Sequence, residues 1–482
     1  MNAILTFLKN FDDSAPKPIR SAKIARQKFI EKSAEIPRVT ENYSGATIIP
    51  RGEHTVSRQH ISENALKVVY KLKKEGFDAY LVGGCVRDLL LGREPKDFDV
   101  VTNALPEQIA QFFSNCRIIG KRFRLAHIIY GRDIIEVATF RKSSGESPTD
   151  AKHQTKEGRI LKDNLYGTID DDVWRRDFTI NALYYNIRDF SIVDYVGGIA
   201  DHKAGLIRLI GDAGERFRED PVRMIRAIRF AVKLGFKLHD DCEKAIAPNA
   251  HLLANVPAAR LHDEVVKLFL TGYGVQTFEM LRHYGLFEVL FPAVEKNLSL
   301  EDSHFPKMMV IHALQNSDNR ITENKPVAPY FLFAALLYEP MLQRAREKIT
   351  KGIHESDAYF SAASEILTQQ VRRISLPRHL TLAIREIWNQ QAKFEFRVGA
   401  KASKLLSHPR FRAAYDFLLL RAQTGSAPQE LADWWTTYQK VNETERRKMT
   451  QPPQQPKSAK SKKKRTYRKK TKTVMISNSG VD

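Results

Sequence analysis

Two acidic residues separated by a single position, Asp97 and Asp99, form the pattern in this chain with the clearest chemical meaning. The sequence predicts a strand over Phe98–Val101, and residues two apart on a strand point to the same face. Two carboxylates held side by side repel each other unless a cation lies between them, and oxygen ligands suit Mg²⁺. Two such ions would promote in-line attack of a hydroxyl on an α-phosphate. The alternative is a solvated acidic strand edge.

A third carboxylate, Glu136, lies in the run Ile134–Phe140, which is rich in β-branched and aromatic residues. Such a run predicts a strand with little reason to hold a charge. A lone glutamate on a strand is usually just exposed to solvent. The alternative, which we expect here, is that Glu136 joins Asp97 and Asp99 as a metal ligand.

A glycine pair precedes these carboxylates. The predicted strand Ala79–Val82 runs into Gly83 and Gly84, and then into a short helix that ends at Gly92. Glycines let backbone N–H groups approach phosphate oxygens closely, and a helix N-terminus favours anions. Arg87 would add a charge-assisted contact to the same phosphates. A glycine pair alone is weak evidence, because many such pairs form plain turns.

The elements around these residues predict a compact α/β head followed by helices. Order is expected to begin near Ser62, and apolar residues at helical spacing continue through most of the chain after Asp172. We predict helices over residues 221–234, 259–271, 275–285, 329–347, 355–372, 380–391 and 410–422. The predicted regions are a mobile basic arm (1–55), a catalytic head (56–172), a neck that binds nucleotide and RNA (173–272), a helical body (273–450) and a disordered basic tail (451–482).

Composition points to a polyanionic partner. The chain has 482 residues and a formal net charge of +21, and ten of the sixteen residues from Lys457 to Lys472 are Lys or Arg. Such a field favours nucleic acid or an anionic membrane surface.

No apolar run approaches the roughly 20 residues that span a bilayer. Three widely separated cysteines fit a reducing cytoplasm and give no zinc spacing. We therefore expect a cytoplasmic protein without a transmembrane segment.

Five motifs between Ala79 and Gly272 resemble those of the class II nucleotidyltransferases of the polymerase-β superfamily. In chain order they are GG-x-V-R-D, D-x-D, E-V-A-T-F-R, R-R-D-F-T-x-N-A-L and E-D-P-x-R-x-x-R-A-x-R-F. The resemblance implies an α+β fold, with a small mixed-sheet polymerase-β-like head followed by a mostly α-helical neck, body and tail region. It also implies two Mg²⁺ ions, a nucleoside triphosphate substrate such as ATP, and no nucleic-acid template.

The same resemblance assigns roles to individual residues. Gly83, Gly84 and Arg87 would hold the triphosphate, and Asp97, Asp99 and Glu136 would serve the metals. Arg176 and Asn181 would lie near the ribose and phosphate. Asp177 either takes part in catalysis or forms a salt bridge that orients Arg176.

Asp220 and Arg223 would contact the edge of the base, since residues three apart share one face of a helix. The alternative for Asp220 is a helix N-cap before Pro221 at the first helical position. Arg226 and Arg229 either face RNA phosphates or are solvated.

The five motifs are shared by poly(A) polymerases and tRNA CCA-adding enzymes. The segment Ile119–Ile128 and the basic tail resemble those of proteobacterial poly(A) polymerases, and they favour AMP addition from ATP to RNA 3′ ends; CCA addition is the alternative. Lys121, Arg122 and Arg124 in that segment would grip the RNA backbone. RNA-decay proteins are a further expected class of partner. Whether the tail binds RNA, a membrane surface peripherally or a protein stays open.

Overall fold

The computed structural model describes residues 43–120, 124–142, 166–299 and 308–451. The chain forms two compact units, one up to Leu382 and the other from Ala383 onward. Three predicted features lie outside the described residues: the basic arm before residue 43, the cations Lys121 and Arg122, and the basic tail from residue 452.

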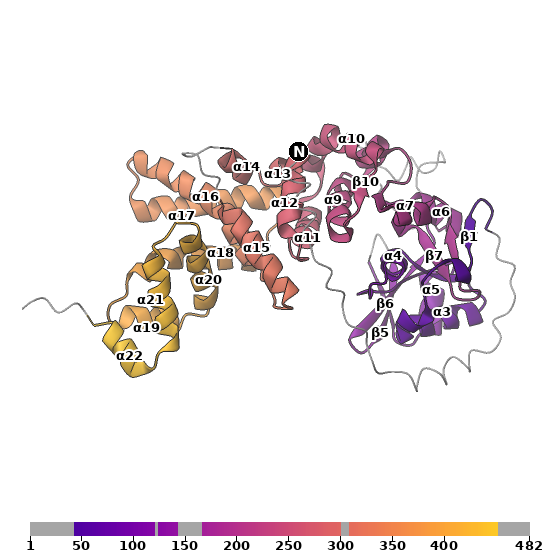
Figure 1. The fold of residues 1–482 in the computed structure, drawn as a ribbon, viewed down its shortest axis with the longest axis horizontal. Coiled ribbons are helices and arrows are strands. Elements are labelled where there is room, and N and C mark those ends of the chain that lie inside the picture. The colour runs from indigo at the N-terminus through magenta and orange to yellow at the C-terminus, as the bar shows by residue number, and fades with distance from the viewer. Residues whose placement is uncertain (1–42, 121–123, 143–165, 300–307, 452–482) are drawn as a thin grey trace, which may run out of the picture. The chain divides into compact units, whose positions relative to one another are not determined.

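The first unit begins with an eight-stranded sheet in the order β1-β8-β7-β2-β3-β6-β5-β4 (Figure 1). Strands β3 and β6 pair in parallel, and the other neighbours pair antiparallel. The mixed sheet confirms the predicted fold class. The strands are β1 (Thr47–Ile49), β2 (Ala79–Val82), β3 (Asp99–Thr102), β4 (Cys116–Ile119), β5 (Leu125–Tyr130), β6 (Asp133–Thr139), β7 (Leu183–Asn186) and β8 (Ile192–Asp194).

The central strand β2 is buried on both faces. Helices cover one face, and residues between Phe140 and Ile210 cover the other. All four residues of β2 are buried. Ala79 and Leu81 belong to one apolar cluster, whereas Tyr80 and Val82 belong to a second cluster on the opposite face. The first cluster includes residues of helices α3 (Glu63–Lys74), α4 (Gly84–Leu90) and α5 (Pro106–Phe112).

The predicted limits of the head, residues 56 and 172, are wrong because the sheet extends past both of them. Strand β1 comes from the predicted mobile arm, and β7 and β8 come from the predicted neck. These strands have only three or four residues, so they carry little local pattern. Their place in the sheet is set by pairing with partners far along the chain, such as Ile48 with Val193.

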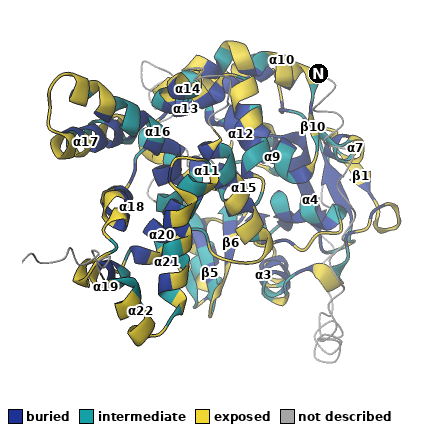
Figure 2. Ribbon diagram, turned by 60° about the vertical axis from the view of Figure 1, so that its left-hand side comes forward, coloured by how far each residue is buried: buried dark blue, intermediate teal, exposed yellow. Residues whose placement is uncertain are grey.

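Helices make up the rest of the first unit apart from the short parallel pair β9 (Leu206–Ile207) and β10 (Lys237–Leu238). The predicted helices from residue 221 to 372 are all present, with ends shifted by a few residues. The helices are α6 (Ile169–Trp174), α7 (Gly198–Ala204), α8 (Ala213–Glu219), α9 (Val222–Leu234), α10 (Asp240–Asn249), α11 (Ala258–Phe269), α12 (Gly274–His283), α13 (Leu286–Leu290), α14 (Pro292–Leu298), α15 (Met309–Thr322), α16 (Pro329–Thr350) and α17 (Glu355–Arg373). Figure 2 shows buried and exposed stripes along these helices, as their apolar spacing predicts.

The second unit starts within α18 (Arg378–Gln391), so the predicted body 273–450 is divided between two units. It continues through α19 (Ala400–Leu406), α20 (Phe411–Gln423), α21 (Gln429–Lys440) and α22 (Glu443–Met449). Its core surrounds Trp435, whose indole N–H donates to the Phe394 carbonyl at 2.9 Å.

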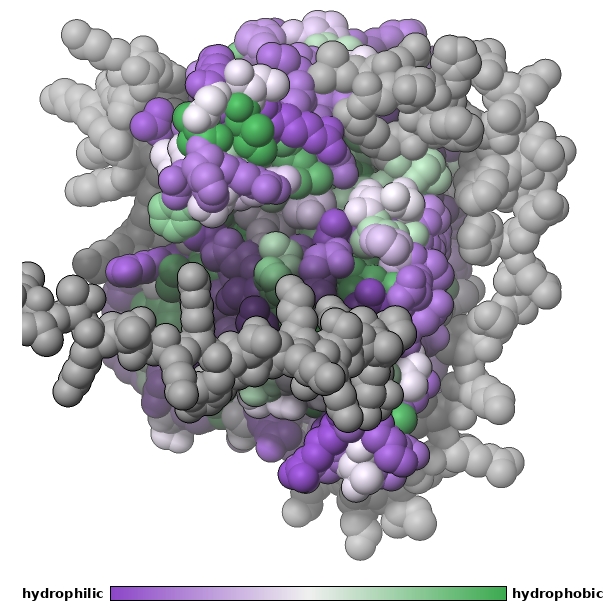
Figure 3. All heavy atoms as spheres, turned by 90° about the vertical axis from the view of Figure 1, so that its left-hand side faces the viewer, coloured by the Kyte–Doolittle hydropathy of each residue, from purple (hydrophilic) through white to green (hydrophobic). Residues whose placement is uncertain are grey.

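Figure 3 shows one face of the molecule, where hydrophobic patches lie among hydrophilic side chains. Within the described ranges, no helix combines the length and apolarity needed to cross a bilayer.

Candidate active site

Strand register brings the glycine pair and two of the predicted metal ligands to one end of the sheet. Val82, the last residue of β2, pairs with Asp99, the first residue of β3. Asp99 in turn pairs with Glu136 on the parallel strand β6. Gly83 follows Val82 directly, so the glycine turn begins beside the two carboxylates.

Asp99 lies in an electrostatic environment that disfavours its own charge. Burial first, then the charge of Glu136, and also Asp97, raise the pKa of Asp99 to about 6, although Arg176 opposes them. A divalent cation would relieve this repulsion, and carboxylate oxygens are the ligands that Mg²⁺ prefers. The donor set therefore fits the implied metal. In the described part of the chain, however, no three acidic, His or Cys side chains already form a metal-binding group.

The predicted strand over residues 98–101 begins one residue later, so Asp97 lies before the strand ladder. The argument that Asp97 and Asp99 share a strand face is therefore wrong in its geometry. Asp97 is exposed, whereas Asp99 is half-buried. Their charges still interact, since Asp97 contributes to the raised pKa of Asp99.

The position of Glu136 is compatible with both alternatives that its sequence context suggested. Its side chain is about half exposed, and it nevertheless lies beside Asp99 in the sheet. Across the opposite pairing, His127 on β5 faces it, with Nε2 3.3 Å from the carboxylate Oε1. Sequence analysis missed His127, which stands in the basic segment Ile119–Ile128.

The glycine turn packs against two arginines. Gly83 has φ +75°, a conformation that L side chains rarely adopt, and it immediately precedes α4. A Cβ at Gly83 would lie 3.7 Å from Nη1 of Arg176, and one at Gly84 would lie 3.5 Å from Nη2 of Arg87. The turn thus places backbone next to two guanidinium groups, and guanidinium groups suit phosphate oxygens.

Arg87 is buried and held by its neighbours. Its guanidinium donates to the Asp88 carboxylate at 2.6 and 2.8 Å and to Oδ1 of Asn181 at 2.7 Å. It also lies 5.1 Å from the ring centre of Phe230. These contacts bring together Arg87 and Asn181, two predicted nucleotide ligands that are 94 residues apart.

Asp172 is a buried charge beside the predicted nucleotide ligands that sequence analysis missed. Its carboxylate is fully buried and accepts hydrogen bonds from Arg175, from Arg176 and from the hydroxyl of Tyr184. Burial opposes its charge, but Arg176 and Arg175 outweigh burial and lower the pKa of Asp172 to about 2. The acidic run 170–172 just before two arginines was the available signal.

Asp177 does not orient Arg176, so that alternative is wrong. It accepts from Nε of Arg226 at 2.9 Å, from the Phe178 backbone N–H at 2.8 Å and from Nδ2 of Asn181 at 3.3 Å. Asp172 holds Arg176 instead. The pKa of Asp177 is lowered: burial opposes its charge, but the charge of Arg226 and these hydrogen bonds outweigh burial.

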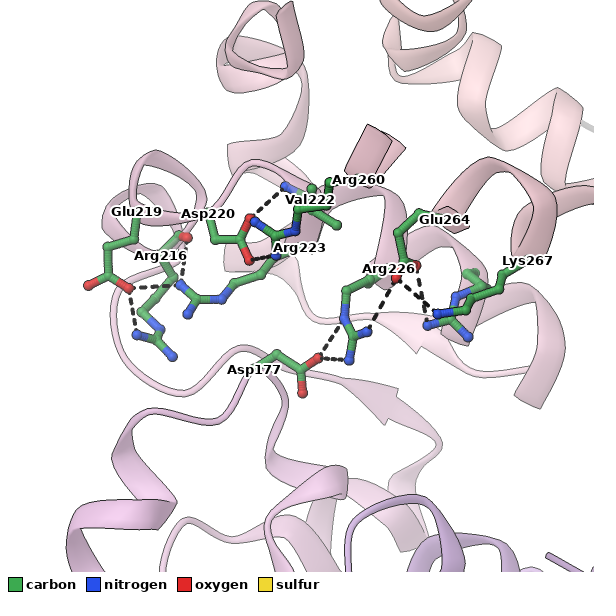
Figure 4. Close-up of polar contacts among 11 residues, drawn as sticks. Asp177, Arg216, Glu219, Asp220, Val222, Arg223, Arg226, Arg260, Glu264 and Lys267 are labelled. Carbon is green, nitrogen blue, oxygen red and sulfur yellow. Dashed lines mark hydrogen bonds and ion pairs between the residues drawn. The ribbon is translucent and has the colours of Figure 1, made fainter. Parts of the chain in front are cut away.

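Figure 4 shows how the predicted base-reading pair is held. Asp220 accepts from the Val222 backbone N–H at 3.2 Å and pairs with Arg260 on α11. The N-cap of α9 is Pro221, so the bond to Val222 resembles a cap but Asp220 is not the N-cap residue that its alternative predicted. Arg223 donates to Oε2 of Glu219 at 2.8 Å. α9 begins at Val222, so Asp220 stands before the helix, rather than on its face.

The predicted RNA-binding arginines take part in ion pairs. Nη1 of Arg226 lies 3.8 Å and Nη2 of Arg229 lies 3.7 Å from the Glu264 carboxylate, which Lys267 also approaches (Figure 4). Neither arginine is simply solvated. Arg124 pairs with Glu107 on α5.

Comparison with known protein families finds three matches along the chain. Residues 79–208 match the family described as the poly A polymerase head domain. Residues 235–298 match a family described as a probable RNA- and SrmB-binding site of polymerase A, and residues 351–471 match the arginine-rich C-terminus of polymerase A.

Individual relatives agree with these matches. Poly(A) polymerase I of Salmonella typhi is 47% identical over 399 residues, which cover 82% of this chain and 86% of the relative. A CCA-adding enzyme of Lactobacillus helveticus is 34% identical over 266 residues and is covered to 64% of its length. Among solved structures, the Bacillus stearothermophilus CCA-adding enzyme in complex with CTP superposes with a TM-score of 0.51 at 26% identity, covering 77% of this chain and 80% of that enzyme.

Proposed function

We infer the function from the premise that this chain belongs to the poly(A) polymerase I family. The chain is a template-independent polynucleotide adenylyltransferase, which adds AMP from ATP to RNA 3′ ends. The similarity to poly(A) polymerase I extends over most of both chains, whereas the similarity to CCA-adding enzymes is weaker and shorter. RNA and ATP are therefore its substrates, and RNA-decay proteins are the class of protein partner that we propose.

One observation carries the assignment of the chemistry to this site. Asp99 stands between the glycine turn after β2 and Glu136 on β6, and its carboxylate is destabilised as an anion in the absence of a cation. Such a carboxylate gains most when a hard cation binds. We propose Asp97, Asp99 and Glu136 as the ligands of two Mg²⁺ ions, which would supply Lewis-acid stabilisation of the phosphate charge.

The remaining residues bind and orient the triphosphate. We propose that the backbone at Gly83 and Gly84, with Arg87 and Arg176, holds the β- and γ-phosphates. The α-phosphorus would then lie near Asp99, at the start of β3. There the RNA 3′-hydroxyl would lose its proton to solvent and its oxygen would bond to phosphorus, while the bond to the pyrophosphate oxygen breaks and pyrophosphate leaves.

The base is proposed to enter beside α9. Asp220 is anchored by Arg260 and the Val222 N–H, and Arg223 is anchored by Glu219, so the carboxylate and the guanidinium hold defined positions before ATP arrives. Pre-positioned donors and acceptors favour one base over others, because a mismatched base leaves them unpaired. We propose that Asn181, which accepts a hydrogen bond from Arg87, contacts the ribose.

Substitution of the carboxylates tests this assignment. Asp99→Ala and Asp97→Ala should each lower the rate of AMP incorporation by about 100-fold or more, because each removes a metal ligand. Glu136→Ala should have a smaller effect, since Glu136 is half exposed. Asp433→Ala, which removes an exposed carboxylate on α21, is the matched control.

Circular dichroism should show that all four variants fold, because loss of Asp97, Asp99 or Glu136 removes a repelled charge in the metal-free protein and Asp433 is exposed. A near-normal rate for Asp99→Ala in a folded protein would refute the assignment of the chemistry to this site.

A further inference from the structure

A cavity of about 260 Å³ is lined by Trp174, by the segment 208–211 and by residues at the start of α10. None of the steps above uses it. We propose that it binds one nucleotide of single-stranded RNA, with the base against Trp174 and the phosphate at Arg208. This inference deepens the proposed function, on which it rests, by adding a site for the RNA away from the reacting 3′ end.

The indole of Trp174 gives the cavity its stacking surface. Trp174 is the last residue of α6 and is 57% exposed, the largest exposed fraction of any described tryptophan. Tryptophan is amphipathic and normally buries its ring, so a ring left open at the mouth of a cavity is available to a planar ligand. Stacking on aromatic rings is how proteins hold unpaired bases.

Polar groups at the cavity suit the rest of a nucleotide. Among the described residues Arg208 contacts Asp201 through Nε alone, at 3.0 Å, which leaves both terminal amino groups able to donate to a phosphate. Nδ1 of His239 lies 3.3 Å from the Asp241 backbone N–H, from which it accepts, and 3.5 Å from the Asp241 carboxylate. Leu209 and Ala213 give the floor an apolar surface for the base.

The cavity shares a wall with the active site. The Arg208 carbonyl accepts from the Thr179 N–H at 3.0 Å, and the Ile210 N–H donates to the Asp177 carbonyl at 3.1 Å. The segment 208–211 therefore pairs with the turn that carries Asn181, and Thr179 of that turn also lines the cavity. A nucleotide bound there would contact the backbone that positions the ATP ligands.

Nucleotide chemistry in this cavity has two potential sources, RNA and free mononucleotide. RNA is favoured by the position of His239 and Asp241, which belong to the segment that matches a probable RNA-binding family. The net charge of +21 also draws polyanions more strongly than mononucleotides. The test below distinguishes binding of RNA from binding of free mononucleotide.

The test is a binding titration without ATP and Mg²⁺, so that no transfer is needed. The probe is a ten-nucleotide oligo(A) RNA with a 5′ fluorescein, followed by anisotropy in wild type, Trp174→Ala, Trp174→Phe and Arg208→Gln. Loss of one stacked base should raise the Kd of Trp174→Ala about 5- to 150-fold. Trp174→Phe should restore most of the affinity, and Arg208→Gln should reduce the salt slope by about one.

Phe360→Ala, which removes an exposed aromatic ring of α17 that does not line the cavity, should bind like wild type. Ultraviolet cross-linking should attach the oligo(A) to the peptide that carries Trp174. An unchanged Kd for Trp174→Ala overturns the proposal. Loss of the cross-link when AMP is added at concentrations below the oligo(A) Kd also overturns it, because that result would identify a site for free mononucleotide. If wild type extends RNA while Trp174→Ala binds RNA normally, the proposed function stands and this inference alone fails.

Discussion

At the scale of single residues, Asp172 shows how a buried charge organises the nucleotide site. One carboxylate without solvent exposure receives two guanidinium groups and a tyrosine hydroxyl. Arg176 is thereby fixed beside Gly83, where the triphosphate is proposed to bind. The charge of Asp172 thus stabilises the fold and positions a ligand at once.

Replacing this carboxylate should reveal both effects. Asp172→Asn should lower the free energy of unfolding by about 3 kcal/mol, because it leaves two partly buried guanidinium groups without their counter-charge. The KM for ATP should rise, since Arg176 is released. Urea denaturation and steady-state kinetics measure the two quantities, and Asp433→Ala is the control.

The pKa of Asp172 adds a pH signature to the same comparison. The pKa of Asp172 in the folded protein, about 2, lies below the ordinary value of 3.8. The stability that the Asp172 carboxylate adds to the fold is therefore complete above about pH 4 and is lost as the pH falls toward 2. The stability difference between wild type and Asp172→Asn should therefore be constant above pH 4 and should narrow below it. A difference that stays constant down to pH 2 would contradict this account.

Sequence reasoning identified the residues whose chemistry is local and missed those whose role depends on distant partners. Asp99, Glu136 and the glycine pair were predicted from types and spacing, and strand register brings them together. The salt bridge to Arg176 that was one alternative for Asp177 is not formed, because its partner Arg226 lies 49 residues away and no short-range pattern links the two. His127 was missed for the same reason, since only the pairing of β5 with β6 places it beside Glu136.

At the scale of elements, helix α7 is fitted directly onto the turn that carries Asn181. Gly198 begins α7, and a Cβ there would lie closer to the Thr179 carbonyl oxygen than real side chains approach. The turn is the short 3-10 helix η4 (Thr179–Asn181). Asp194 fixes the start of α7 by accepting from the backbone N–H groups of Gly198 and Ile199, both at 2.9 Å.

Adding one methyl group at this contact should therefore disturb ATP binding. Gly198→Ala should force η4 to shift, at a cost of about 1–3 kcal/mol in stability, and should raise the KM for ATP. Gly52→Ala is the matched control, because a Cβ at Gly52 would meet nothing within 4 Å. Equal KM values for the two variants would show that α7 does not position the nucleotide segment.

Long helices were predictable from sequence, whereas the limits of the sheet were not. Helix α9 carries buried residues at helical spacing and ends at Gly235, which has φ +73°. Strands β1 and β7 have three or four residues each, and β7 is buried throughout, so alternation gave no signal. Their membership in the sheet follows from tertiary pairing.

At the scale of the whole molecule, the chain combines a sheet-based catalytic part, a long helical part and a separate helical unit from Ala383 onward. The segment from Lys457 to Lys472 carries ten cations and lies outside the described residues. Its composition predicts an electrostatic arm that captures RNA, since each neutralised phosphate releases a counterion.

Removal of all residues after Gln455 tests that arm. The truncated chain should keep its turnover at saturating RNA, because no active-site motif lies beyond this point. Its KM for RNA should rise, and the dependence of RNA affinity on salt should flatten. Titrations at three salt concentrations compare it with the full chain, and identical slopes and affinities would show that the arm binds something other than RNA.

The most direct test of the central claim follows the whole chain acting on RNA. Purified protein is incubated with Mg²⁺ and each nucleoside triphosphate separately, then with all four, on RNAs that end in different sequences, and the products are sized and sequenced. The account predicts long tails of A with ATP on every RNA, and no extension without a divalent cation. Products that stop after three nucleotides of mixed C and A, with CTP used before ATP, would contradict it.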